Sequence, residues 1–204
     1  MSTNEKFLKI KAFTLFVSRD AMNIDGLSEM TLEKFLAQGF LHEFADIYKL
    51  HRYREQIVEM EGFGEKSYQN LIASIEASRE TTLPRVLYAL GIAGIGVATA
   101  KVLSRHFDYS LDKLMQADVE QLSEVEGIGE VIATALADYM QNPQNIQQIK
   151  NLMAEVKLEE AAAVETDSPI SGKSFCITGS LNYYANRNEL KDIIEQKGGK
   201  VTGS

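Results

Sequence analysis

The sequence predicts a mainly α-helical region built from four helix–turn–helix repeats, followed by a truncated α/β segment. Three observations lead to this fold class: a Gly-apolar-Gly pattern with three full copies and a fourth that has serine as its last residue, apolar residues at helical spacing around the copies, and a strand–helix–strand pattern in residues 169–204. The chain has 204 residues, of which 45% are hydrophobic and 25% charged, an ordinary balance for a globular protein.

The repeat is centred on a short turn. Its four copies, numbered turns 1 to 4 in chain order, are Ile24–Ser28, Met60–Gly64, Ile92–Gly96 and Val125–Gly129. Their first glycines are 36, 32 and 33 residues apart. Three copies have a second glycine, whereas turn 1 has Ser28 in that place.

Apolar residues flank the turns at the spacing of one helix face. The face that precedes turn 3 contains Leu83, Val86, Leu87 and Leu90, and the face that follows turn 4 contains Ile132, Ala135, Leu136 and Tyr139. Pro84 fits the first turn of its helix, because the missing N–H costs no hydrogen bond there. Each unit is therefore a helix, a tight turn and a second helix, and the segment 39–50 predicts a further short helix.

This turn has the chemistry of an anion site. A first glycine in the left-handed conformation ends one helix, and the apolar residue after it points inward. The second glycine leaves the backbone bare where the next helix begins, so the free N–H groups of that helix can receive a phosphate. Amide donors need no basic surface, which suits a chain with a formal net charge of −8.

The candidate phosphate-binding residues follow from this reading. The main candidates are Gly62, Gly64, Lys66, Gly94, Gly96, Lys101, Gly127 and Gly129, and the weaker ones in the same repeats are Gly26, Ser28 and Arg105. Contacts to phosphate carry no base sequence, so the expected partner is the backbone of duplex DNA.

The units resemble the helix-hairpin-helix motif. The stretches 16–26, 62–67 and 90–96 are similar to the four-hairpin domain of bacterial NAD-dependent DNA ligases, and the resemblance runs from about Phe13 to Leu152. It implies sequence-independent binding of duplex DNA, preferably nicked, as the non-catalytic part of an enzyme that seals nicks in replication and repair. The remainder of the ligase chain is then a second expected partner.

The end of the chain resembles the start of a BRCT domain, which terminates those ligases. Residues 172–179 predict a strand, Asn186 can cap a helix, and Lys200 and Val201 open a second strand. In BRCT domains that bind phosphate, a Ser/Thr-Gly pair after the first strand helps to hold it. The resemblance therefore adds Thr178 and Gly179 to the weaker phosphate-binding candidates.

These features divide the chain into four parts. We predict a tail of uncertain structure over 1–12, a helix-hairpin-helix domain with four repeats over 13–154, an acidic linker over 155–168, and an incomplete BRCT domain over 169–204. The linker assignment rests on its acidic residues and on the Ser168-Pro169 step, which disfavours helix.

Several features of the ligase family are missing from the sequence. It has no Lys-x-Asp-Gly adenylation motif and lacks the four zinc cysteines that precede the hairpin domain in the family, since its single cysteine is Cys176. We therefore expect no catalytic residue, no metal site and no cofactor in this chain, with NAD, zinc and a divalent metal implied only for the full-length enzyme. The chain is expected to be a fragment that is inactive alone. With no apolar run long enough for a membrane span and no secretory signal, a cytoplasmic location is expected.

Two other classes of function stay open at this point. Paired hairpins also occur in other repair proteins, such as junction binders and excision nucleases. The acidic net charge permits a protein-interaction module as well.

Overall fold

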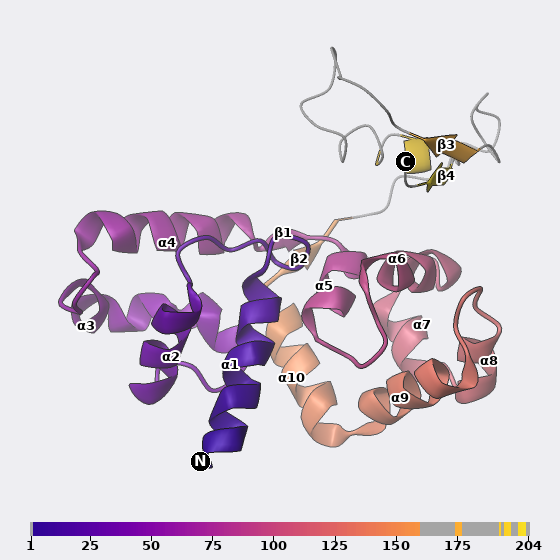
Figure 1. The fold of residues 1–204 in the computed structure, drawn as a ribbon, viewed down its shortest axis with the longest axis horizontal. Coiled ribbons are helices and arrows are strands. Elements are labelled where there is room, and N and C mark those ends of the chain that lie inside the picture. Colours follow the sequence, from indigo (N-terminus) through magenta and orange to yellow (C-terminus); the bar gives the residue numbers. More distant parts are fainter. Residues whose placement is uncertain (1, 160–173, 177–191, 193, 197–199, 203–204) are drawn as a thin grey trace. The chain divides into compact units, whose positions relative to one another are not determined.

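The computed structural model describes residues 2–159, 174–176, 192, 194–196 and 200–202, and the chain divides into two units at 159/160. The first unit is mainly helical, as predicted (Figure 1). Its helices are α1 (Thr3–Val17), α2 (Glu29–Ala37), the 3₁₀ helix η1 (Phe44–Tyr53), α3 (Arg54–Val58), α4 (Glu65–Ala77), α5 (Leu83–Ala89), α6 (Val97–His106), α7 (Leu111–Gln116), α8 (Val119–Ser123), α9 (Glu130–Gln141) and α10 (Pro143–Met153). Two short strands, β1 (Glu80–Thr81) and β2 (Lys157–Leu158), pair in parallel.

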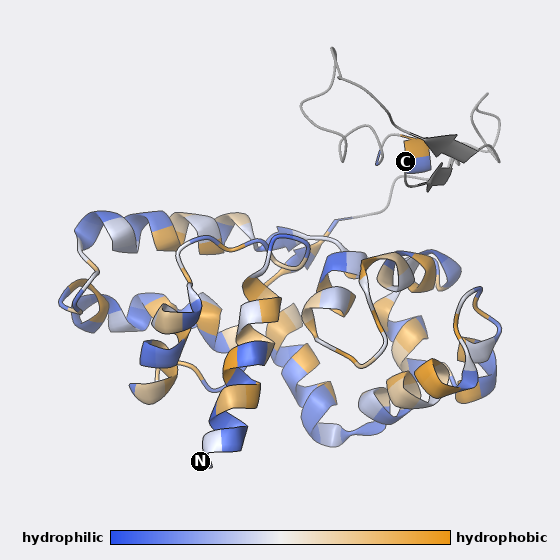
Figure 2. Ribbon diagram, viewed as in Figure 1, coloured by the Kyte–Doolittle hydropathy of each residue, from blue (hydrophilic) through white to orange (hydrophobic). Residues whose placement is uncertain are grey.

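The four predicted hairpins are present in the first unit. Hairpin 1 is α1 with α2, hairpin 2 is α3 with α4, hairpin 3 is α5 with α6, and hairpin 4 is α8 with α9. Hairpins 1 and 2 form the first pair and hairpins 3 and 4 the second pair. α1, α5 and α10 lie in the middle of the first unit, with α2, α3 and α4 on one side and α6 to α9 on the other (Figure 1). The helices carry both hydrophobic and hydrophilic residues along their length (Figure 2), which is typical of helices that bury one face.

One hydrophobic core runs through both pairs, from Phe13 to Leu152. Its aromatic centre joins hairpin 1 to η1. Phe16 of α1 is fully buried and stacks on Phe44 with ring centroids 4.4 Å apart, while Phe13 meets the same ring edge-on at 5.2 Å. Such contacts add to the burial of large apolar surfaces. The glycine turns therefore lie on one packed body with a continuous core.

The beginning of the chain differs from the prediction, because the tail of uncertain structure over 1–12 is mostly part of α1. Ser2 and Glu5 form a capping box: the Ser2 hydroxyl accepts from the Glu5 N–H at 3.2 Å, and the Ser2 N–H donates to the Glu5 carboxylate at 3.0 Å. Lys6 also forms an ion pair with Glu33 of α2 at 2.8 Å. The sequence carried a readable signal, Ser-x-x-Glu before an apolar-periodic run.

The predicted boundary between domain and linker also differs. Residues 155–159 were assigned to an acidic linker over 155–168, but β2 pairs with β1 in the first unit. The Lys157 N–H donates to the Arg79 carbonyl at 2.6 Å, and the Glu159 N–H donates to the Thr81 carbonyl at 2.7 Å. These long-range backbone bonds have no local signal in the sequence.

The second unit contains a parallel pair of strands, β3 (Ser174–Cys176) and β4 (Lys200–Thr202), in the register Ser174 to Lys200. Both lie where strands were predicted. Residues 192 and 194–196 are helical, within the predicted helix. The assignment to a BRCT domain stays a prediction, and Thr178 and Gly179 lie outside the described residues.

Candidate nucleic-acid interface

The four turns share the backbone geometry that the sequence predicted. The first glycine of each is in the left-handed region, with φ of +92° at Gly26, +83° at Gly62, +81° at Gly94 and +80° at Gly127. Residues with a side chain rarely adopt this conformation, so glycine is required at this point of the turn. The prediction that this glycine ends the preceding helix is wrong, because those helices already end at Val17, Val58, Ala89 and Ser123. The left-handed glycine instead redirects the chain into the next helix.

The residue between the two glycine positions points into the protein. Leu27, Ile95 and Ile128 are buried, and Phe63 is half-buried with its ring 5.8 Å from that of Phe35 in α2. In turns 2, 3 and 4 its N–H also donates to the carbonyl three residues earlier, at 3.0–3.1 Å. The apolar residue thus anchors the turn, while the glycines in turns 3 and 4 stay exposed.

The second glycine position begins the next helix. Gly64, Gly96 and Gly129 precede α4, α6 and α9 in extended conformation, and no side chain caps these three helices. The first-turn N–H groups of a helix have no partner within it, and the helix dipole adds a partial positive charge there. Turns 2, 3 and 4 therefore each present uncapped amide donors beside a bare backbone.

Turn 1 has a different helix start. The Ser28 hydroxyl accepts from the Thr31 N–H at 3.2 Å and lies 3.0 Å from the Thr31 hydroxyl. This side chain therefore occupies one of the donors that an anion would use. Turn 1 is the least suited of the four to bind phosphate.

The space around the glycines separates open positions from packed ones. A Cβ atom added at Gly62, Gly64, Gly96, Gly127 or Gly129 would meet nothing within 4 Å. At Gly26 it would meet Leu71 Cδ1 of α4 at 3.4 Å, and at Gly94 it would meet Ile132 Cγ1 of α9 at 3.0 Å. Turns 1 and 3 thus each pack on the second helix of the neighbouring hairpin, which couples the hairpins in each pair.

This difference gives a prediction for stability. Gly94→Ala should cost about 2 kcal/mol of unfolding free energy, because alanine is strained at this φ and its Cβ presses on Ile132. Gly127→Ala has the same backbone strain in open space and should cost about 1 kcal/mol. Urea unfolding of both variants measures the difference. Equal losses would mean that the Ile132 contact contributes nothing.

Acidic side chains directly follow three of the turns. Glu29, Glu65 and Glu130 are the first residues of α2, α4 and α9, whereas α6 begins with Val97. A carboxylate suits the helix dipole but repels a bound phosphate. Turn 3, which has no acidic residue in the first turn of its helix, is therefore the most favourable anion site of the four.

Arg54 is a cation beside turn 2 that the sequence analysis missed. Its guanidinium binds the Glu65 carboxylate at 2.6 Å, and this hydrogen bond lowers the pKa of Glu65. The same guanidinium lies 5.7 Å from the centre of the Tyr68 ring. The positive charge of Arg54 therefore offsets the negative charge of Glu65 at the start of α4. Arg54 lies on α3, the other helix of hairpin 2, and its separation from Glu65 in the sequence does not indicate that the two residues are in contact.

The predicted cations lie at different distances from the turns. Lys66 is exposed in the first turn of α4, and Lys101 is half-buried in the middle of α6. Arg105 is exposed in the last turn of α6, which at 1.5 Å per residue is about 13 Å along the axis from Gly96. Lys66 and Lys101 are thus closer to their turns than Arg105.

Two exposed apolar side chains also lie next to turns. Met30 and Val131 are the second residues of α2 and α9, and they are 68% and 83% exposed. Sequence periodicity could have identified both, because neither lies on the buried face of its helix. They place apolar surface beside turns 1 and 4.

Within the described residues, no group of three or more His, Cys, Asp or Glu side chains is placed to hold a metal ion. None of the described helices is both long and apolar enough to cross a membrane.

Comparison with known proteins gives a family match and a set of relatives. The family described as "Helix-hairpin-helix motif" matches residues 85–149, which contain turns 3 and 4. A DNA ligase of Lachnoclostridium phytofermentans is 48% identical over 196 residues, covering 96% of this chain and 30% of the relative. The DNA ligases of Ruminiclostridium cellulolyticum and Acinetobacter baumannii (strain AYE) are 42% and 40% identical, with 96% of this chain covered in each case. The chain spans about 30% of the length of these relatives.

Proposed function

The chain corresponds to a region of the bacterial DNA ligases that is about 30% of their length and contains a helix-hairpin-helix motif. From this we propose that it binds the backbone of duplex DNA. The observation that carries this proposal is the repeated geometry of turns 2, 3 and 4. Each has a bare glycine backbone and an uncapped helix start. Such a helix start is a ready site for a phosphate oxygen.

Turns 3 and 4 are the central contacts in this proposal. They belong to one hairpin pair, and Gly96, Gly127 and Gly129 have open space where a strand would approach. Turn 3 also lacks the acidic residue that follows the other turns. Turn 2 contributes through Gly64 and Lys66, with Glu65 offset by Arg54. Because phosphates are the same in every sequence, the binding is independent of base sequence.

The wider role is that of the non-catalytic, DNA-holding part of an NAD-dependent ligase that seals nicks in replication and repair. Adenylate transfer needs a nucleophilic lysine, and the Lys-x-Asp-Gly motif of the family is absent from this sequence. NAD, zinc and a divalent metal are accordingly assigned to the remainder of such an enzyme. A high identity to proteins named DNA ligase favours this role over a junction binder or an excision nuclease.

The proposal is tested by fluorescence anisotropy with labelled DNA. We expect the chain to bind two duplexes of unrelated sequence with equal affinity, and to bind single strands more weakly. A nicked and an intact duplex of the same sequence measure nick preference. A chain that binds none of these DNAs at low salt would contradict the proposal and favour a protein-interaction role.

The salt dependence of binding separates amide contacts from ionic ones. Each phosphate neutralised by a cation adds about 0.9 to the slope of log affinity against log salt. The double change Lys66→Ala and Lys101→Ala should therefore flatten the slope by up to about 2. Arg105→Ala is the control, since Arg105 lies at the far end of α6, and it should change the slope by much less than the about 0.9 of one phosphate contact. A change of about 0.9 in the control would show that the cations act without regard to the turns.

A further inference from the structure

The two hairpin pairs are consecutive in the chain, and the link between them is short. The first pair ends at Ala77 with α4, and the second begins at Leu83 with α5, so only residues 78–82 separate them. The pairs also share one hydrophobic core, with α1 packed on α5 and α10 packed on both η1 and α9. Two arginines of this region add hydrogen bonds across the same junction.

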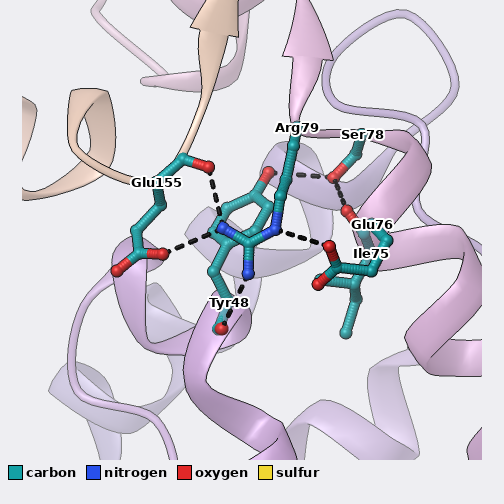
Figure 3. Close-up of polar contacts among 6 residues, drawn as sticks. All are labelled: Tyr48, Ile75, Glu76, Ser78, Arg79 and Glu155. Carbon is teal, nitrogen blue, oxygen red and sulfur yellow. Dashed lines mark hydrogen bonds and ion pairs between the residues drawn. The ribbon is translucent and has the colours of Figure 1, made fainter.

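Arg79 binds three segments at once (Figure 3). Its Nη2 donates to the Tyr48 carbonyl of η1 at 3.2 Å, and its Nε donates to the Glu76 carboxylate of α4 at 2.9 Å. Its Nη1 donates to both the carbonyl and the carboxylate of Glu155, at 2.8 and 2.9 Å. Glu155 follows α10, which packs on α9 of the second pair and on η1 of the first. The planar, five-donor guanidinium is the side chain that can make such a set of bonds.

The surroundings of Arg79 hold it in this position. The guanidinium lies 5.0 Å from the centre of the Tyr48 ring, and the buried Tyr48 hydroxyl bonds to Ser78 Oγ at 2.9 Å. Ser78 Oγ in turn donates to the Ile75 carbonyl at 2.7 Å (Figure 3). β2 then pairs with β1 directly beside this group. Residues 155–159 at the end of the first unit are thus bonded to residues 78–82, the link between the pairs.

Arg85 makes the second connection. It lies in the first turn of α5, in the second pair, and its Nη1 donates to the carbonyls of Arg19 and Ala21, both at 2.9 Å. These carbonyls belong to the segment that follows α1 in the first pair. The two arginines therefore connect the pairs from both sides of the link.

We propose that Arg79 and Arg85 are positioning residues for DNA binding, which together with the shared core hold the spacing between the turns of the first pair and those of the second. This inference rests on the proposed DNA binding. Two binding modules held at a fixed spacing act on a long ligand as one, because engagement of the first raises the effective concentration of the second. A short duplex that engages one pair gains nothing from the connection. The arginines therefore raise the affinity for long duplexes and leave the affinity for short ones unchanged.

The test compares two DNA lengths. The variants are Arg79→Lys and Arg85→Lys, singly and together, which keep the charge but lose the forked geometry. Affinity is measured by anisotropy on a DNA hairpin of about 8 base pairs and on a duplex of about 24, roughly 27 and 80 Å long at 3.4 Å per base pair. Arg52→Lys is the control, an exposed arginine of η1 changed in the same way. Thermal unfolding shows which variants remain folded.

We expect the double variant to lose roughly tenfold in affinity for the long duplex and less than about twofold for the short hairpin, with the control unchanged at both lengths. Equal losses at both lengths, or no loss at either, would overturn the inference. If the double variant does not fold, the single variants carry the same length comparison. If the unchanged protein binds neither DNA, the proposed function itself fails, and the inference fails with it.

Discussion

The double variant Gly96→Asp, Gly129→Asp is expected to lose about a hundredfold in affinity for duplex DNA. Its free energy of unfolding is expected to be at least as large as that of the unchanged protein. Both glycines precede a helix in extended backbone conformation, and a Cβ at either position meets nothing within 4 Å. Aspartate is favoured at such a position, because its carboxylate accepts from the first-turn N–H groups. The same carboxylate occupies the phosphate site and repels the phosphate, at about tenfold or 1.4 kcal/mol per turn.

Stability and DNA affinity should therefore move in opposite directions in this variant, whereas a general loss of structure would lower both. Ser110→Asp is a matched control, since Ser110 already caps α7 and lies outside the four turns. It adds one negative charge at a helix start, as each of the two glycine changes does, and should change DNA affinity by less than about twofold if only the turns bind phosphate. A double variant that is stable and binds as tightly as the unchanged protein would show that these turns only pack helices.

Alkaline pH is expected to destabilise the protein through Tyr48. Burial raises the pKa of this phenol to about 12, although its hydrogen bond with Ser78 acts in the opposite direction. An unfolded tyrosine titrates near 10, so the fold favours the neutral form. The contribution is fully present below pH 10 and is lost as the pH rises from 10 to 12, by about 2 to 3 kcal/mol.

The variant Tyr48→Phe isolates this effect, because it keeps the ring and removes the ionisable hydroxyl. Urea unfolding between pH 9 and 12 should show the unchanged protein losing stability more steeply than Tyr48→Phe, since other groups titrate in both. Parallel curves would mean that the Tyr48 hydroxyl ionises as freely in the fold as in the unfolded chain. The same variant also tests the surroundings of Arg79, because the Arg79 guanidinium lies over the Tyr48 ring.

The turns could be predicted from the sequence because their chemistry is local. A left-handed glycine, an apolar residue and then glycine or serine specify a backbone path within five residues, and the positive φ at all four first glycines agrees with it. The helix before turn 3 and the helix after turn 4 were also predictable, since their apolar residues repeat on one face. Even the missed start of α1 had a local signal in Ser2 and Glu5.

Features that depend on distant parts of the chain could not be predicted in this way. Arg79 and Glu155 are 76 residues apart, and nothing near either one marks the bond between them. The same holds for Arg85 with Ala21 and for the contact between Gly94 and Ile132. The sequence therefore predicts which turns can bind phosphate, whereas the spacing between them depends on tertiary contacts that only the structure shows.

The central claim, that backbone amides of turns 3 and 4 hold DNA phosphates, is tested most directly by following amide chemical shifts during a DNA titration of isotope-labelled protein. The first-turn amides of α6 and α9, residues 97–99 and 130–132, should shift most and move alike for two unrelated duplex sequences. The first turn of α7, which Ser110 caps, serves as the internal reference and should stay nearly unchanged. If DNA binds and the largest shifts lie elsewhere while these six amides do not move, turns 3 and 4 do not hold the phosphates and the claim is wrong.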